Sequence, residues 1–531
     1  MALDAIIIAD SGVDSLSATS PLKLRLDGRT ASVQVVLNYL EHDGHIEPPI
    51  KNDGIMSWSS SPKLNGISLL SYLQRHHFQV ELIDRYFEDR TNFCNLLQQN
   101  PRVVILSTTF IHSKSDLREI VQDIRSLAPD IFVVAGGPFI YFSYRLLQRS
   151  RESSYLTGPA RDDFLFLNTD DEPAVDLYVV SLRGEQILRD ALQRIKRNQP
   201  INDLPNLARL EEAGYTFTKQ VDDVSSANET LVDWDSLPDS VFSSGVVPVQ
   251  ASSGCPYKCA FCNFTRDRRL IGMKPLEQLT AELKSIASRG VRYVWFVDDN
   301  FRLGSDDLEA VCERFVDEDL NIMWMSFIRA STLKNIDAEL LRRSGCVEVQ
   351  LGLESAHPQI LRNMNKKATP TMYGNVVRNL LSAGINCSTY FIFGFPGETE
   401  ETAIRTRRFI RSIEYPELEG ILTWSLFPFT LVPLSPIYEA KMRKKYELTG
   451  YMQTWKHRTM DSDKAREYLM KTFLELENSG TIYRDDNQEI FLGLEPYQRK
   501  RFLIKRHELS KRAADKPLDG KAIIDSFKEI W

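Results

Sequence analysis

The sequence has few cysteines, no excess of positive charge and no long apolar run, and each of these shortages excludes a class of protein. Only 7 of 531 residues are cysteine, which does not suit the disulfide framework of a small secreted domain. The formal net charge is −7, so no overall basic field favours nucleic acid. No apolar stretch approaches the ~18 residues of a membrane-spanning helix, and the N-terminus lacks a secretory signal pattern. We therefore expect a cytoplasmic protein with no nucleic-acid partner and no membrane partner.

The chain is long enough for two or three domains with substantial cores. Hydrophobic residues make up 43% of it and charged residues 26%, as in ordinary globular proteins. Alternating apolar strands and amphipathic helices run through most of its length. Such alternation is typical of parallel βαβ units, so we predict an α/β fold.

Three of the seven cysteines lie together, at Cys255, Cys259 and Cys262, in a C-x3-C-x2-C spacing. A [4Fe–4S] cluster normally takes four cysteine ligands, so a set of three leaves one iron open. The alternative is a zinc knuckle, which usually needs a second cysteine or histidine pair, and none lies nearby. The scattered cysteines are expected to be small buried hydrophobes; they are Cys94, Cys312, Cys346 and Cys387.

The cysteine run, with the segment from about residue 246 to 429, resembles the radical S-adenosylmethionine (SAM) superfamily. The resemblance implies that the three cysteines hold a [4Fe–4S] cluster whose open iron chelates the amino and carboxylate groups of SAM. It implies a partial, TIM-like (β/α)6 barrel with SAM across the strand ends, and it places Phe261, just before the last cysteine, among the SAM contacts.

Polar residues follow the predicted strands of this segment, in the order that the resemblance requires. The strands are expected at 246–251, 291–297, 322–327, 347–353, 389–393 and 421–427. The resemblance implies that Asp298 or Asp299 accepts from the SAM amino group; the sequence does not choose between them. It assigns Arg329 to the SAM carboxylate. The remaining implied contacts are Glu354 and Ser355 for ribose or the charged end, and Ile392 and Gly394 for adenine. Gly394 is the first residue of the turn Gly-Phe-Pro-Gly-Glu.

The N-terminal half carries small and hydroxyl residues at the ends of its predicted parallel strands, where ligands of such sheets bind. This half, about residues 60–200, resembles the Rossmann-like cobalamin-binding domain that precedes many radical SAM domains. The Asp-x-His-x-x-Gly motif of that domain is absent, and Arg85 stands near the vacant ligand position, where it either discourages a lower axial ligand or is an ordinary surface residue. A domain that no longer holds cobalamin is the alternative. The candidate cobalamin contacts are Arg85, Ser107, Thr108, Thr109, Gly136, Gly137, Gly184 and Glu185.

The predicted boundaries give four parts: 1–200 for the cobalamin-binding domain with an N-terminal extension, 201–245 for a connection, 246–435 for the radical SAM core, and 436–531 for a mostly helical C-terminal domain. Residues 141–175 are expected to form an acidic insertion loop. The basic run from Arg499 to Arg506 is interpreted as a solvated helix face. The alternative is a site that binds an anionic partner. Trp455 and His457 either line a substrate cavity or belong to the core with a surface histidine.

These features together predict an enzyme with three cofactors: a [4Fe–4S] cluster, SAM and cobalamin. The resemblance implies a methyltransferase that moves a methyl group from SAM through methylcobalamin to an unactivated carbon, or phosphorus, of a natural-product-type substrate, either a small molecule or a peptide. It also implies an external electron donor of the flavodoxin or ferredoxin kind. The alternatives are a non-methylating enzyme that cyclises or rearranges its substrate, and a cluster-bearing sensor without turnover.

Overall fold

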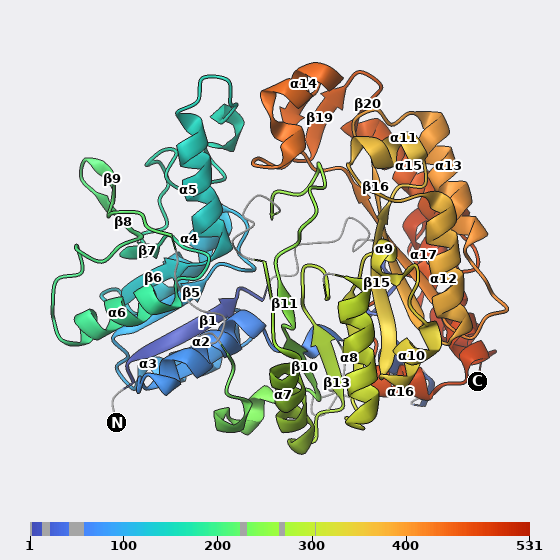
Figure 1. The fold of residues 1–531 in the computed structure, drawn as a ribbon, viewed down its shortest axis with the longest axis horizontal. Helices are drawn as coiled ribbons and strands as arrows, with labels where there is room; N and C mark the ends of the chain where they lie inside the picture. The colour runs from blue at the N-terminus through green and yellow to red at the C-terminus, as the bar shows by residue number, and fades with distance from the viewer. Residues whose placement is uncertain are drawn as a thin grey trace. The chain divides into compact units, whose positions relative to one another are not determined.

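A computed structural model describes residues 3–12, 22–41, 58–222, 231–264, 271–302 and 304–530, and every structural statement below concerns these residues. They form two compact units (Figure 1). The first contains the described residues within Met1–Ser15 and Pro62–Leu237, and the second those within Leu16–Ser61 and Pro238–Trp531. Among the helices of the described chain, none is both long and apolar enough to span a membrane.

The first unit is built on a seven-stranded sheet whose order is β4-β1-β5-β6-β7-β8-β9. The parallel strands are β1 (Ala5–Asp10), β4 (Val80–Arg85), β5 (Val103–Ser107), β6 (Phe132–Gly136) and β7 (Leu177–Val179), and the antiparallel hairpin is β8 (Leu207–Glu211) and β9 (Gly214–Phe217). Strand β1 pairs on one side with β4 and on the other with β5. The chain therefore reverses direction across the sheet at β1, and the carboxyl ends of β1 and β5 flank a topological switch point.

Helices connect these strands as the sequence predicts. They are α2 (Leu64–Arg75), α3 (Arg90–Leu97), α4 (Lys114–Leu127), α5 (Pro138–Ser150) and α6 (Glu185–Lys196). Ser113 accepts a hydrogen bond from the Asp116 N–H at 3.1 Å and caps the start of α4. The prediction of an insertion loop from residue 141 is wrong for its first ten residues, because they belong to α5, which runs from Pro138 to Ser150. The fixed φ of Pro138 suits the first turn of a helix.

The second unit is built on a seven-stranded, fully parallel sheet in which the spatial order equals the chain order. Its strands are β10 (Val246–Val249), β13 (Tyr293–Phe296), β14 (Met323–Phe327), β15 (Cys346–Glu354), β16 (Asn386–Phe393), β17 (Leu422–Pro428) and β21 (Gly480–Thr481). The first six match the six predicted strands, and β10 and β21 are the two edges, as an incomplete barrel requires. The connecting helices include α7 (Leu276–Ser288), α8 (Ser305–Asp317), α10 (Ala338–Arg343), α12 (Pro370–Ser382) and α13 (Glu400–Ser412).

The part after residue 435 contains strands that the sequence did not predict. Helix η8 (Pro436–Tyr438) and helix α14 (Ala440–Tyr446) lead into a three-stranded antiparallel sheet, β18 (Thr449–Tyr451), β19 (Thr454–His457) and β20 (Met460–Asp461). Helix α15 (Ser462–Glu475) then packs on β16 and β17 and leads to β21. Its apolar face therefore covers the barrel sheet, as the helix of one more βαβ unit.

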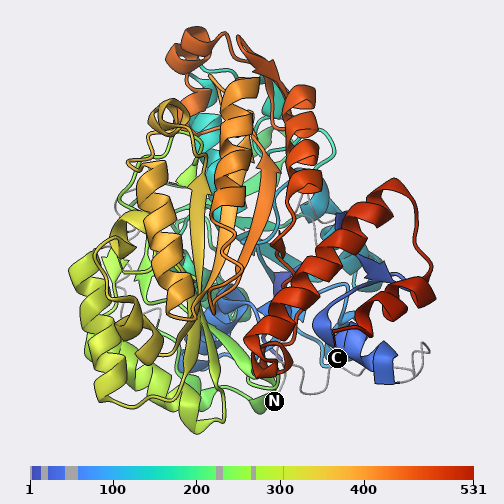
Figure 2. The same cartoon turned by 90° about the vertical axis from the view of Figure 1, so that its right-hand side faces the viewer.

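The last helices, α16 (Gln488–Gly493), α17 (Pro496–Asp515) and α18 (Gly520–Phe527), share one apolar core with α1 (Val33–Glu41). Figure 2 shows α1 beside the C-terminal helices. The sequence grouped residues 22–41 with the first domain, whereas the structure packs them on the C-terminal helices. Apolar residues such as Val36, Phe502 and Phe527 are fully buried there.

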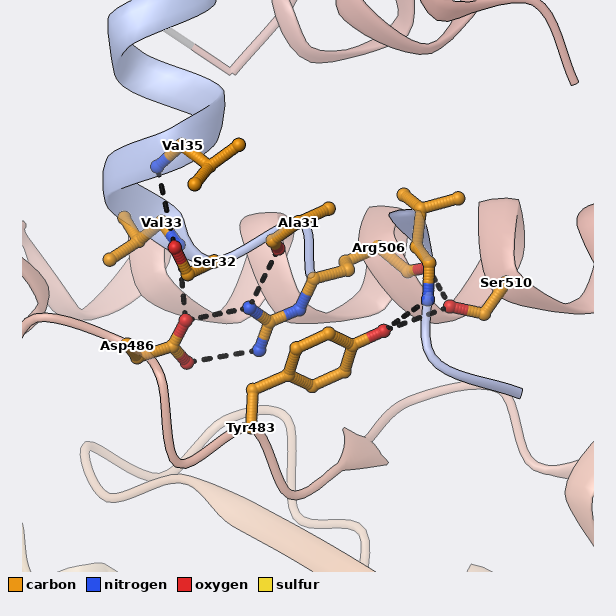
Figure 3. A network of polar contacts seen from close by, with 9 residues as sticks. Ala31, Ser32, Val33, Val35, Tyr483, Asp486, Arg506 and Ser510 are labelled. Atoms are coloured by element: carbon orange, nitrogen blue, oxygen red, sulfur yellow. Dashed lines mark hydrogen bonds and ion pairs between the residues drawn. The ribbon is translucent and has the colours of Figure 1, made fainter. Parts of the chain in front are cut away.

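A buried ion pair fixes this arrangement (Figure 3). The Arg506 guanidinium donates to both carboxylate oxygens of Asp486, at 2.7 and 3.0 Å, and to the Ala31 carbonyl at 3.2 Å. Asp486 also accepts from the Val33 N–H at 3.0 Å, so it caps the start of α1. Arg506 is 1% exposed, so the prediction that the whole basic run is a solvated helix face is wrong at this residue.

Candidate functional site: the cysteine loop and the strand ends

The three clustered cysteines lie in the loop that follows β10, after the short strand β11 (Ser252–Ser253). The Cys262 N–H donates to the Cys259 carbonyl at 3.2 Å, which closes a turn between the second and third thiols. Cys259 is buried, whereas Cys255 and Cys262 are partly exposed. Of the scattered cysteines, Cys312, Cys346 and Cys387 are buried as predicted, and Cys94 is partly exposed.

Asp298, two residues after the end of β13, anchors the start of this loop. Its carboxylate accepts from the Ala251 N–H at 2.8 Å, from the Ser252 N–H at 2.8 Å and from the Ser252 hydroxyl at 2.6 Å. Burial raises the pKa of Asp298 to about 7. The carboxylate is occupied by the loop itself, so its geometry is that of a positioning residue.

Asp299, its neighbour, is exposed and contacts the loop with one oxygen. That oxygen accepts from the Gly254 N–H at 2.9 Å. Gly254 has φ +72°, and a Cβ there would lie 3.1 Å from the Cα of Ile271, so a glycine is required. Two adjacent carboxylates therefore hold the loop, but only Asp299 is accessible from outside.

The far side of the loop is held through backbone groups. The Ala260 N–H donates to the Met364 carbonyl at 2.8 Å, and the Ala260 carbonyl accepts from the Ile437 N–H at 2.9 Å. The Asn365 side-chain amide donates to the Lys258 carbonyl at 2.6 Å. The residues on both sides of Cys259 are thus fixed by segments more than 100 positions away along the chain.

Arg329, after β14, brings a positive charge to the thiols. Its guanidinium lies 3.5 Å from the Cys259 sulfur and 3.7 Å from the centre of the Tyr257 ring. Burial raises the pKa of Cys255, and the Arg329 charge acts in the opposite direction. A cation beside a thiol favours the thiolate, which is the form that binds metal.

Glu354, at the end of β15, is buried and pairs with Lys366 at 2.9 Å. Its φ is +64°, where β15 is irregular against β16. A Cβ at Gly352 would lie 2.5 Å from the Glu354 carboxylate, so this glycine makes room for the pair. Ser355 is fully buried, and its hydroxyl lies 3.3 Å from that of Thr406 in α13, so it faces the helix packing.

The turn after β16 is clamped by the unexpected small sheet. Gly394 has φ +91°, and a Cβ there would lie 2.4 Å from the Trp455 ring. The Gly394 carbonyl is 3.1 Å from Nε2 of His457, whose ring stacks on Trp455 with a 4° interplanar angle. Trp455 and His457 are both buried, so they belong to the core of this region. The expectation that the histidine lies at the surface is wrong.

Phe261 in the cysteine loop reaches the same turn, with its ring 6.4 Å from that of Phe395. Ile392 is half-buried on β16, two residues before Gly394. The Gly394 N–H donates to the carboxylate of Glu398, which is fully buried, and burial raises the pKa of Glu398 to about 8. The cysteine loop and the turn after β16 are therefore packed together.

The donor set of the loop fits an iron–sulfur cluster. It consists of three thiols with a guanidinium at one of them and no imidazole, and soft thiolates suit such clusters. Within the described ranges, no three His, Cys, Asp or Glu side chains are close enough to hold a single metal ion. The ligands of a single zinc ion all lie about 2.0–2.3 Å from it. In a four-iron cube each cysteine binds its own iron, so the three sulfur atoms need not surround a single ion.

The candidate cobalamin contacts of the first unit gather at the carboxyl edge of its sheet. Thr108 donates from its backbone and its hydroxyl to the Gly136 carbonyl, at 2.8 and 2.9 Å. A Cβ at Gly137, whose φ is +111°, would lie 3.1 Å from the Thr108 hydroxyl. Thr108 and Gly137 thus close the gap between β5 and β6. The hydroxyls of Ser107 and Thr109 lie 3.4 Å apart, with Thr109 half-buried.

The other three candidates are at the same edge of the sheet. Arg85 ends β4 and pairs with Asp84 at 3.0 Å. Gly184 precedes α6 and Glu185 begins it; a Cβ at Gly184 would lie 2.7 Å from the Val179 side chain. Sequence reasoning missed Asn65, which donates to the Ser107 hydroxyl and to the Ala9 carbonyl, both at 2.8 Å, and so bridges β1 and β5 at the switch point. Its only signal is its place at the start of α2.

Comparison with known proteins bears on this site directly. The profile of the Radical SAM superfamily matches residues 249–410, which include all three cysteines and the ends of β13 to β16. The chain carries a radical SAM domain. The predicted relationship to this superfamily is confirmed, and the cysteine loop lies at the start of the matched region.

Similar proteins extend beyond the radical SAM domain. An uncharacterized methyltransferase of Pyrococcus horikoshii is 24% identical over 66% of this chain and 73% of its own. The bacteriochlorophyllide d C-12(1)-methyltransferase of Chlorobaculum tepidum is 29% identical over 45% of this chain and 54% of its own. The anaerobic magnesium-protoporphyrin IX monomethyl ester cyclase of Cereibacter sphaeroides is 24% identical over 64% of this chain and 58% of its own. This chain thus spans little more than half the length of the last two.

Two solved structures share the fold. The radical SAM methyltransferase TsrM of Kitasatospora setae, solved with cobalamin and a [4Fe–4S] cluster, has a TM-score of 0.55 and 18% identity over 82% of this chain and 77% of its own. The cobalamin-dependent SAM radical enzyme OxsB has a TM-score of 0.57 and 15% identity, over 99% of this chain and 74% of its own. Both matches reach outside the radical SAM domain, and the predicted α/β fold class is confirmed.

Proposed function

We propose that this protein is a cobalamin-dependent radical SAM methyltransferase that methylates an unactivated carbon, or phosphorus, of a natural-product-type small molecule or peptide. The observation that carries the proposal is the cysteine loop. Three thiols lie in a loop held by Asp298 and by backbone bonds on its other side, and Arg329 lies 3.5 Å from one of them, the Cys259 thiol. The likeness to TsrM and OxsB supports the cobalamin part, and the methyltransferases among the relatives support the reaction.

In this proposal Cys255, Cys259 and Cys262 hold the cluster, and the neighbouring strand ends hold SAM. Asp299 is the better candidate for the SAM amino group, because the Asp298 carboxylate already accepts three hydrogen bonds. Arg329 neutralises the charge of the thiolates and of the SAM carboxylate. The remaining proposed SAM contacts are Phe261, Glu354, Ile392 and Gly394.

Cobalamin would bind at the carboxyl edge of the first unit's sheet, beside the switch point between β1 and β5. Ser107 and Thr109 offer hydroxyls there, and Gly136 has no side chain that would keep a ligand from the backbone. Thr108 and Gly137 shape the edge through their mutual contact. Arg85 places a cation at the end of β4, where the usual motif would supply histidine.

When bound, the cluster supplies the electron that cleaves SAM, and cobalamin supplies a carrier for a methyl group. The protein orients and shields these reactants. Burial of Cys259 and the packing of Phe261 on Phe395 keep water from one side of the thiols. The hydrogen bond from the Gly254 N–H to the Asp299 carboxylate holds the loop in register with the strand ends.

A second candidate is a non-methylating enzyme that closes or rearranges a ring. The likeness to the magnesium-protoporphyrin IX monomethyl ester cyclase favours it. The two candidates differ in the product, because methylation adds one CH2 unit from SAM and cyclisation adds none.

The deciding experiment is anaerobic incubation of the reconstituted protein with methyl-labelled SAM and a cell extract, followed by mass analysis. We expect a labelled product that is one CH2 unit heavier than its precursor. A SAM-dependent product without label would support the second candidate. Cys262→Ala should abolish iron–sulfur absorbance while Cys94→Ala, in the first unit, keeps it. Unchanged iron content in Cys262→Ala would refute the ligand assignment.

A further inference from the structure

A cavity of about 420 Å³ lies against the outer side of the cysteine loop. We call it the basic cavity. Its wall includes Lys258 and Ala260 from the loop, residues of helix α11 (Pro358–Asn363), and residues of α14. None of the proposed SAM contacts lines it. It is therefore distinct from the proposed SAM site, although the two share the loop.

The charge of the basic cavity is of one sign. Lys258, Arg362 and Lys445 line it, and no carboxylate does. All three side chains are exposed. Arg362 donates to the neutral Gln359 amide at 2.7 Å. On a chain with a net charge of −7, such a local positive site attracts an anionic partner selectively.

The cavity wall includes the residues on both sides of a proposed cluster ligand. Lys258 and Ala260 are the two neighbours of Cys259 in sequence, and Cys259 itself is only 6% exposed. A partner seated in the cavity is thus separated from this ligand by the thickness of one loop. Hydrogen bonds with Met364, Asn365 and Ile437 hold this part of the loop in place.

We propose that the basic cavity is the docking site of an acidic, low-potential one-electron carrier protein that reduces the cluster. The inference rests on the proposed function, because it takes the three cysteines to hold a redox-active cluster. An acidic loop of the carrier enters the cavity and pairs with Lys258, Arg362 and Lys445. One electron leaves the reduced flavin or iron–sulfur centre of the carrier and enters the oxidised cluster, and no atom crosses the interface.

The test compares two reductants, reduced flavodoxin and dithionite, on the reconstituted full-length protein. The variant is Arg362→Glu with Lys445→Glu, which reverses two charges of the cavity outside the cysteine loop. The matched control is Lys334→Glu with Arg343→Glu, two exposed cations of the same unit that do not line the cavity. Cluster reduction is followed by absorbance in a stopped-flow instrument, and flavodoxin binding is measured separately by titration with the oxidised carrier.

We expect the cavity variant to need about tenfold more flavodoxin for half-maximal reduction at low salt, and to lose most of the salt dependence. Its reduction by dithionite and its iron content should equal those of the wild type. The control variant should behave as the wild type with both reductants. Equal flavodoxin dependence and equal binding in all three proteins would overturn the docking site and leave the proposed function intact. If no cluster forms, the proposed function fails, and the binding titration still tests the surface by itself.

Discussion

The Asp298 carboxylate at the end of β13 accepts hydrogen bonds from both the backbone N–H and the hydroxyl of Ser252, at 2.8 and 2.6 Å. Ser252 lies three residues before the first cysteine of the loop. A buried carboxylate that accepts several hydrogen bonds from one loop fixes the position of that loop. The contact ties the second strand of the barrel to the proposed cluster ligands.

The first prediction separates the roles of the two adjacent aspartates. In Asp298→Asn an amide N–H group replaces one acceptor and faces an N–H or O–H donor of the loop. We expect a loss of about 1–3 kcal/mol in the free energy of unfolding and less iron bound per chain. In Asp299→Asn one oxygen still accepts from Gly254, so stability and iron content should be close to those of the wild type while SAM binds more weakly. Chemical denaturation, iron analysis and SAM titration measure these quantities. Equal iron loss in both variants would refute the division.

The second prediction concerns the turn after β16. Gly394→Ala places a Cβ 2.4 Å from the Trp455 ring at a φ of +91°, so either the ring or the turn must move. We expect destabilisation of at least about 2 kcal/mol and weaker SAM binding. Gly374→Ala in α12 is the matched control. Its Cβ would be 3.9 Å from the nearest atom, and alanine favours a helix, so this variant should gain up to about 1 kcal/mol. A Gly394→Ala protein as stable as the wild type would contradict the packing described here.

The sequence predicted the first six strands of the second unit's sheet well, because each is an apolar run followed by polar or small residues, but it did not predict β21. Where two such residues are adjacent, as in Asp298 and Asp299, the pattern does not say which one points into the fold. The small sheet of β18 to β20 was not predicted. Its strands have only two to four residues, and several of these residues are exposed, so no apolar run marks them. The burial of Arg506 was missed for another reason: its partner Asp486 is 20 positions away and is a neighbour only once α17 has packed.

The third prediction tests that buried pair. Arg506→Met leaves the Asp486 carboxylate buried without its cation, which costs about 3–5 kcal/mol when one partner of a buried pair is removed. Asp486→Leu should be similarly costly and should also loosen the start of α1, which loses the acceptor of the Val33 N–H. The double variant should be more stable than the sum of the two changes implies. Thermal or chemical unfolding of all four proteins gives the coupling energy. A coupling near zero would mean that the two charges do not stabilise each other.

The fourth prediction is a pH dependence that originates at Glu398. Burial raises its pKa from the usual 4.5 to about 8. Between pH 4.5 and 8 the unfolded chain gives up this proton while the folded chain keeps it, so the contribution is full below pH 4.5 and is lost as the pH rises. The slope approaches about 1.4 kcal/mol per pH unit.

Because Asp298 titrates in the same direction, the contribution of Glu398 is isolated as the difference between wild type and Glu398→Gln. The glutamine can still accept from the Gly394 N–H, and the difference should fall steadily from pH 5 to pH 8. Glu401→Gln, at the exposed start of α13, removes a carboxylate without changing a buried group and serves as the control. A wild-type-minus-Gln difference that stays constant over this range would show that Glu398 is ionised in the folded protein.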